Sequence, residues 1–259
     1  MWIGRGVFLG PVLRWVERGL GLASLFAGAV AKVKAEDLFE PLQAPLRQFQ
    51  SGWVIPVLLL VTPAVAVMRR RFDSGRLEHV HDLLDQVCER TFTQATFDLP
   101  QHRRVTLFKY KRFCMWRFPF FSLPPNGYLV PIERSGSGTR KTSSIYKVFD
   151  NGEENEGVAG RVWSAKGNIY VEGLPDIVNK CTDEALAEYA TKTFYPKKRL
   201  SALKKKPTAQ SLMGIPVQVG NKDWGVLVID CVHPKFSERK ARDQFSAVAK
   251  ALSAQLKGL

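Results

Sequence analysis

The sequence has few cysteines and no cysteine pair at metal-binding spacing. Its four cysteines, Cys88, Cys114, Cys181 and Cys231, are widely scattered. Zinc sites normally combine Cys-x-x-Cys pairs with further cysteines or histidines, and no such pair occurs, so we expect no metal site. Unclustered cysteines are typical of a protein kept in a reducing compartment, and not of a disulfide-stabilised scaffold.

Motifs of catalysis and phosphate binding are also missing. The glycine-rich stretch 136–142 lacks the GxxxxGK[ST] spacing of a phosphate-binding loop, so we interpret it as a solvated hairpin tip. No histidine stands in a recognised arrangement with serine or cysteine, and no carboxylate pair is evident. Cys231 and His233 would share one side of a strand, but a strand end beside the core explains this run more simply. We therefore expect no catalytic residue and no enzyme activity.

Positive charge is present in clear excess. Lysine and arginine number 38 against 24 aspartates and glutamates, which gives a formal net charge of +14 and a pI of about 9.8. This balance favours an anionic partner: a phospholipid surface, a nucleotide or a nucleic acid. The sequence has no helix-turn-helix or RNA-binding signature, and charge alone supports only weak, salt-sensitive binding. We therefore do not expect a nucleic-acid partner.

An uncharged run covers residues 53–68. It is slightly shorter than the about 20 residues that span a bilayer. Trp53 stands at one edge, as an interfacial aromatic would, and Arg69–Arg71 stand at the other, as on a cytoplasmic side. A buried core helix is the alternative, but Pro56 and Pro63 disfavour it and are tolerated in spanning helices. The run predicts a transmembrane helix.

A second, shorter candidate span covers residues 19–33. It could cross the membrane, lie in the interface or belong to a cleaved signal peptide. With one or two spans, residues 1–72 are predicted to anchor the protein in the cell membrane. Residues 73–259 are then predicted to form a cytoplasmic domain, because the arginines at 69–71 mark the inner side.

Two helical patterns flank the predicted domain. Residues 76–92 place apolar side chains three and four positions apart, and residues 239–256 repeat this pattern. A helix directly after a membrane span often pairs with its copy, so we expect a homodimer. The other interpretation is that the helix covers one face of a sheet, and both can hold.

Residues 211–233 carry the strongest strand signal. Apolar residues alternate over 211–219, Gly220–Asp223 supply a turn, and a second apolar run follows. A strand that is apolar on both sides is central to a sheet, so both faces must be covered. Further strands are expected at 103–113, 128–133, 144–149 and 169–173, and further helices at 157–163 and 183–193.

The order of these elements resembles a GAF domain, and three stretches carry the resemblance over residues 76–257. Glu156–Trp163 followed by Ile169–Val171 is similar to the family's glycine-containing helix and the strand after it. Ser211–Val217 and Gly225–Asp230 resemble two further strands of the family. The resemblance implies an α+β fold, an antiparallel sheet sandwiched between helices. It also implies a small ligand in a cleft between the sheet and the loops and helix on one face.

Three departures from the family narrow the ligand. Asn179–Lys180 and Phe194 match part of a cyclic-nucleotide signature, but no Asp-Glu follows at the right distance. Cys181 is followed by Thr182 and not by the histidine usual at a bilin attachment site. Ala159 stands where members that reduce free methionine sulfoxide place a reactive cysteine. These departures argue against all three chemistries and leave cofactor and ligand unidentified.

Five residues make up the candidate ligand-binding site. Trp163, Tyr170 and Tyr195 would supply aromatic walls, and Arg161 or Lys180 a positive charge. Core packing is the alternative interpretation of Trp163 and Tyr170. We expect a membrane-anchored sensor that binds a small, anionic or nucleotide-like ligand and signals through its dimer and membrane helices. The alternatives are a ligand-gated effector that perturbs the membrane and a dimerisation module without a ligand.

Overall fold

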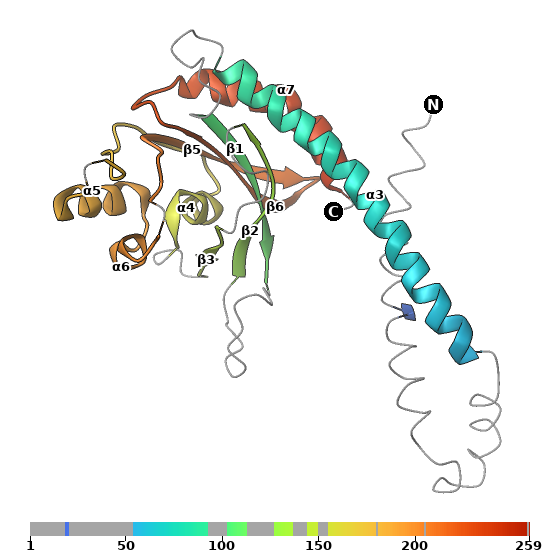
Figure 1. Cartoon of the computed structure of the whole chain (residues 1–259). Coiled ribbons are helices and arrows are strands. Elements are labelled where there is room, and N and C mark those ends of the chain that lie inside the picture. Colours follow the sequence, from blue (N-terminus) through green and yellow to red (C-terminus); the bar gives the residue numbers. More distant parts are fainter. Residues whose placement is uncertain are drawn as a thin grey trace, which may run out of the picture. The chain divides into compact units, whose positions relative to one another are not determined.

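The computed structural model describes residues 19–20, 54–92, 103–112, 127–136, 144–149, 155–179, 181–204, 206–257 and 259. Helices and strands follow one another in the order that the sequence predicts, with one additional short helix, α6 (Figure 1). In chain order they are α3 (Val54–Thr91), β1 (Arg103–Lys111), β2 (Gly127–Gly136), β3 (Tyr146–Val148), α4 (Gly157–Ala165), β4 (Ile169–Val171), α5 (Asp183–Thr193), α6 (Lys197–Ser201), β5 (Ser211–Val219), β6 (Lys222–Cys231) and α7 (Glu238–Leu256). The chain divides into two compact units, and residues 79–256 form the one that contains the sheet.

Residues 54–68 of the predicted span lie in α3. Within the described part of the chain, no helix is both long enough and apolar enough to cross a membrane. The uncharged run falls short of about 20 residues, and Arg69–Arg71 follow it inside the same helix. The predicted membrane spans are therefore not supported. Of the second candidate span, 19–33, all but Gly19 and Leu20 lies outside the described residues.

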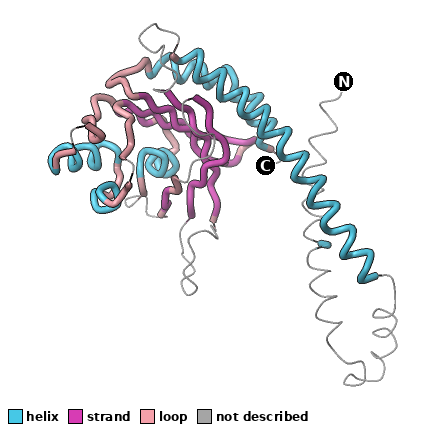
Figure 2. Tube along the Cα trace, in the orientation of Figure 1, coloured by secondary structure: helices cyan, strands magenta, loops and turns pink. Residues whose placement is uncertain are grey.

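A six-stranded sheet with the order β3-β2-β1-β6-β5-β4 forms the centre of the unit (Figure 2). All five neighbouring strand pairs are antiparallel. The predicted hairpin at 211–233 is confirmed as β5 and β6, joined at Gly220, which has a φ of +62° that glycine adopts without strain. Because β6 lies between β1 and β5, it is central, as its apolar sequence predicts.

One face of the sheet is covered by α4, which packs on β3, β5 and β6. Phe108, Val226 and Val228 of the sheet share a buried cluster with Val158 and Val162 of α4, which are at most 8% exposed. The helix approaches closely because β5 has a glycine beneath it: a Cβ at Gly214 would lie 2.5 Å from Val162 Cγ2.

On the opposite face lie the alternate side chains of the same strands, including Val105, Leu107 and Ile229, which are fully buried. The helix α7 packs on β5 and buries one stripe of its surface. Val80, Leu84, Val87 and Cys88 of α3 are buried as well. The two helical patterns predicted at 76–92 and 239–256 are therefore confirmed. So is the α+β class, an antiparallel sheet with helices on both faces (Figure 2).

Candidate functional site

Arg104 and Asp230 form an ion pair on the α4 face of the sheet. They lie opposite each other on β1 and β6. Arg104 Nε donates to Asp230 Oδ1 at 2.6 Å, and Arg104 Nη2 lies 2.5 Å from the same oxygen. Asp230 is only 7% exposed, and its charge raises the pKa of Arg104 although burial acts in the other direction. Both nitrogens contact Oδ1, and Oδ2 accepts no hydrogen bond from a described residue.

Arg134 reaches the same face from β2 because of a β-bulge. The register of β2 against β1 shifts by one residue, which leaves Ile132 as the extra residue. The bulge reverses the alternation, so Arg134 lies beside Thr106, and its Nε donates to Thr106 Oγ1 at 3.1 Å. Burial and the nearby charge of Arg104 lower the pKa of Arg134. Arg134 forms no ion pair with a carboxylate of the described chain.

Two tyrosines lie close to these charges. Burial raises the pKa of Tyr146, on β3, to about 12, and Tyr195 and Asp230 act in the same direction. Burial also raises the pKa of Tyr189, on α5, and Asp230 adds to the effect. Neither hydroxyl makes a hydrogen bond to another residue that the structure describes. Both hydroxyls therefore remain neutral donors at physiological pH, beside a buried carboxylate.

A second ion pair, Glu156–Arg199, borders the tyrosines. The Glu156 carboxylate contacts Arg199 Nη1 and also accepts the backbone N–H of Lys147 at 3.0 Å. Glu156 directly precedes α4, whose first residue, Gly157, has a φ of +73°. A Cβ at Gly157 would lie 2.9 Å from Tyr146 Cε1, so glycine is needed on both counts. The pair fixes α6 and α4 against β3 at the edge of the site.

The five residues predicted as the site are only partly brought together. The Tyr195 ring meets the Tyr146 ring edge-on, with centroids 6.2 Å apart. The Arg161 guanidinium lies 5.0 Å from the centroid of the neighbouring Phe194 ring. Arg161 and Tyr195 thus lie along one border of the polar cluster, whereas Lys180 lies outside the described residues.

Trp163 and Tyr170 lie elsewhere. The Trp163 ring stacks on Tyr110 with centroids 4.3 Å apart and planes 9° apart, and Lys166 Nζ lies 3.9 Å from the same ring centroid. Two groups this close must occupy opposite faces of the indole, which leaves neither face for a ligand. The Tyr170 hydroxyl donates to the backbone oxygen of Phe236 at 2.8 Å, on the other side of β4 from Ile169. Trp163 lies on the face of the Arg104–Asp230 pair, but both sides of its ring are covered. Tyr170 lies on the opposite face of the sheet. Neither ring can therefore stack on a ligand at the pair.

Sequence reasoning missed the residues at the centre of the cluster: Arg104, Arg134, Tyr146, Tyr189 and Asp230. The available signal was a charged residue next to an apolar run within a strand: Asp230 after 224–229, and Arg104 before Val105. The two positions are 126 residues apart, so their pairing requires the strand register. The signal for Arg134 was hidden because its face depends on the bulge at Ile132.

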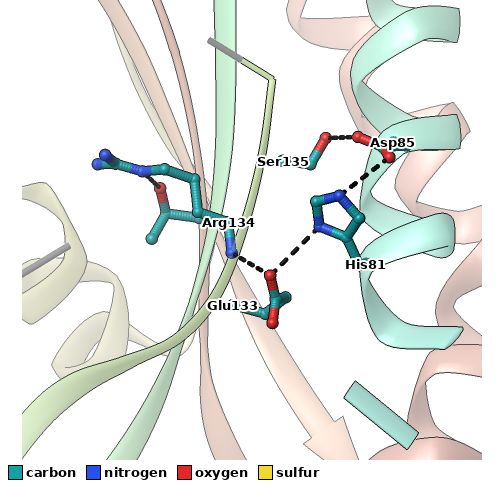
Figure 3. Close-up of polar contacts among 6 residues, drawn as sticks. His81, Asp85, Glu133, Arg134 and Ser135 are labelled. Atoms are coloured by element: carbon teal, nitrogen blue, oxygen red, sulfur yellow. Dashed lines mark hydrogen bonds and ion pairs between the residues drawn. The ribbon is translucent and has the colours of Figure 1, made fainter. Parts of the chain in front are cut away.

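A separate polar cluster connects β2 to α3 on the opposite face (Figure 3). His81 Nε2 lies 3.3 Å from Asp85 Oδ2 and His81 Nδ1 lies 3.2 Å from Glu133 Oε1, although Nδ1 lacks the alignment of a hydrogen bond. The Ser135 hydroxyl donates to Asp85. Among the described residues, no group of three or more histidine, cysteine or acidic side chains could hold a metal ion. The cluster attaches β2 to the helix.

No protein-family model matches the sequence, and no curated protein matches it. Solved structures do match. The type II free methionine-R-sulfoxide reductase from Thermoplasma acidophilum is 12% identical over 70% of this chain and 94% of its own, with a TM-score of 0.39. The free methionine-R-sulfoxide reductase from Neisseria meningitidis is 14% identical over 72% and 86%, with a TM-score of 0.34. The GAF domain of a sensor histidine kinase from Bacillus halodurans is 14% identical over 59% and 80%, with a TM-score of 0.34.

These likenesses bear on two predictions. Several GAF domains are among the similar structures, as the resemblance in the sequence predicts, and the observed six-stranded antiparallel sheet has the predicted α+β architecture. The prediction that the protein is not an enzyme is wrong as an inference, because other similar structures are free methionine-R-sulfoxide reductases, which are enzymes. The absence of a familiar motif in the sequence therefore does not exclude catalysis.

Proposed function

We propose that residues 79–256 form a sensor domain that binds a small molecule over the Arg104–Asp230 ion pair. The observation that carries this proposal is a polar cluster whose hydrogen-bonding groups are not all used within the protein. Asp230 Oδ2 and the hydroxyls of Tyr146 and Tyr189 have no partner among the described residues. None of these three atoms is among the enclosed side-chain atoms that lack a partner, so each can be reached by a small polar molecule.

A purely structural role for the ion pair is the competing explanation. Buried ion pairs contribute little net stability, because the cost of desolvating both charges offsets their attraction. Here the second carboxylate oxygen, Asp230 Oδ2, makes no hydrogen bond to a described residue and remains open to a further donor. Two arginines and two tyrosines around it supply donors for a ligand. The arrangement is better suited to binding a polar molecule than to holding the sheet together.

We further propose that the domain works as a membrane-anchored homodimer with the ligand-binding unit in the cytoplasm. The uncharged run at 53–68 and Arg69–Arg71 support membrane anchoring, and the continuous helix α3 supports a role in signalling. This part is tested by membrane fractionation of cells that express the full chain, followed by alkaline extraction. Recovery of the protein in the supernatant before extraction would contradict it.

Thermal-shift screening of the full-length protein tests the binding proposal. The panel should contain nucleotides, organic acids, amino acids and free methionine-R-sulfoxide, the compound named for two of the similar enzymes. We expect at least one compound to stabilise the protein, and Asp230→Asn to abolish the shift. Asp243→Asn is the matched control, because Asp243 lies exposed on α7. Equal shifts in Asp230→Asn and the control would contradict the proposed site.

A further inference from the structure

We infer that the ligand of this site carries an anionic group, a carboxylate or a phosphate, which the Arg134 guanidinium binds. This inference rests on the proposed function, because it places the ligand over the Arg104–Asp230 pair. It replaces Arg161 and Lys180, the cations expected from the sequence, with a residue on the floor of the site.

Arginines outnumber carboxylates in the cluster around Tyr146. Arg104, Arg134 and Arg199 lie close to two carboxylates, Asp230 and Glu156. Arg104 is paired with Asp230 and Arg199 with Glu156. Arg134 is the one of these three arginines that forms no ion pair with a described carboxylate. Partial burial weakens the solvation of this guanidinium, so a bound anion would stabilise its charged form.

The geometry of Arg134 suits an anion. Its Nε is engaged by Thr106, which fixes the plane of the guanidinium, while Nη1 and Nη2 make no hydrogen bond to a described residue. Two adjacent N–H donors on a planar group match the oxygens of a carboxylate or a phosphate. Figure 3 shows this guanidinium on the side of β2 away from His81, and so away from the carboxylates of Glu133 and Asp85.

Two features separate Arg134 from the many exposed basic residues of this chain. Desolvation, reinforced by Arg104, lowers its pKa, so the charged form gains more from an anionic partner than a solvated lysine would. The β-bulge at Ile132 is what turns this side chain to the α4 face. Bulges are over-represented beside functional sites, where they redirect a side chain.

The test uses inorganic phosphate and acetate as probes on the full-length protein, with sodium chloride at matched ionic strength as the blank. Binding is followed by the NMR signals of the arginine Nε–H groups and by thermal shift. We expect saturable binding of at least one probe, with a Kd on the order of millimolar for so small an anion. Which probe binds tells a phosphate ligand from a carboxylate ligand.

Arg134→Gln should weaken probe binding at least about tenfold, whereas Arg239→Gln, at an exposed position on α7, should leave it unchanged. Arg134→Lys keeps the charge without the paired donors and should give intermediate affinity, which also serves if the glutamine variant does not fold. Unchanged affinity in both Arg134 variants, or no saturable binding of either probe to the parent protein, overturns the inference.

Failure of the anion inference can be distinguished from failure of the proposed binding site. Suppose a compound from the screening panel loses its shift in Asp230→Asn but keeps it in Arg134→Gln. The binding site then stands and the anion inference is wrong. If phosphate or acetate binds through Arg134 while Asp230→Asn has no effect on any compound, Arg134 binds anions but the proposed ligand site over the ion pair is wrong.

Discussion

Glu133 and Arg134 are consecutive residues of β2 whose side chains serve opposite faces of the sheet. Glu133 Oε1 lies 3.2 Å from His81 Nδ1 of α3, and Arg134 Nε donates to Thr106 Oγ1 at 3.1 Å (Figure 3). The Arg134 backbone N–H also donates to the Glu133 carboxylate at 3.3 Å. If a ligand displaces Arg134, the displacement would therefore also move Glu133, which contacts His81 of α3.

The contact between His81 and Glu133 should be measurable as a coupling energy. In a double-mutant cycle of His81→Ala and Glu133→Gln, we expect coupling of about 1 kcal/mol in the free energy of unfolding, because Glu133 is buried and the pair is partly shielded from water. Urea denaturation provides the measurement. The same cycle with His79→Ala is the control, since His79 is exposed, and it should be additive. Additivity in both cycles would contradict the contact.

Removal of one partner of the central ion pair should be costly. Asp230→Ala leaves Arg104 charged and half-buried without a counter-ion, so we expect a loss of about 3 kcal/mol in the free energy of unfolding. The double change Arg104→Met with Asp230→Leu removes both charges and should cost clearly less than the single change. Chemical denaturation compares the two. A double variant less stable than Asp230→Ala would show that the pair itself stabilises the fold.

The close approach of α4 to β5 makes Gly214 sensitive to substitution. Gly214→Ala places a Cβ 2.5 Å from Val162 Cγ2, so α4 must shift, and we expect destabilisation of about 1–3 kcal/mol. Gly75→Ala is the control, because a Cβ there meets nothing within 4 Å inside helix α3. That change should be neutral or stabilise by about 0.5–1 kcal/mol. Thermal unfolding measures both, and an unaffected Gly214→Ala variant would be inconsistent with the packing.

Tyr146 should make the stability depend on alkaline pH. Its pKa is raised from 10.0 to about 12 in the folded protein, so the folded state holds the proton after the unfolded state has lost it. This contribution to stability is complete below pH 10 and is lost as the pH rises toward 12. Tyr146→Phe should therefore flatten the decline of unfolding free energy over this range. An identical decline in parent and variant would contradict the buried, neutral tyrosine.

Local patterns predict the elements of this fold well, because they act within one strand or one helix. The alternation in 211–233 gives the hairpin, and the spacing of apolar residues gives α7. The site depends on longer-range facts. Asp230 meets Arg104 only through the β1–β6 register, and Arg134 reaches their face only through the bulge at Ile132.

The chemical type of a residue was not enough to predict whether it belongs to the ligand-binding site. Trp163 has the composition of a ligand wall, yet Tyr110 and Lys166 cover both faces of its ring. Tyr170 was predicted to be a second ligand wall, but its hydroxyl is hydrogen-bonded to the backbone of Phe236. Tyr195 and Arg161 do border the cluster because α4 and the turn before α6 meet there. In each case, contacts with residues distant in the sequence determine whether the side chain is available to a ligand.

The most direct test of the site is an NMR titration of the full-length protein with the compound that gives the largest thermal shift. The arginine Nε–H signals report on the floor of the site without any substitution. We predict that the signals of Arg104 and Arg134 move together and saturate with one Kd, while that of Arg239 on α7 stays in place. Binding that leaves the signals of Arg104 and Arg134 unchanged would place the ligand elsewhere and contradict the proposed site.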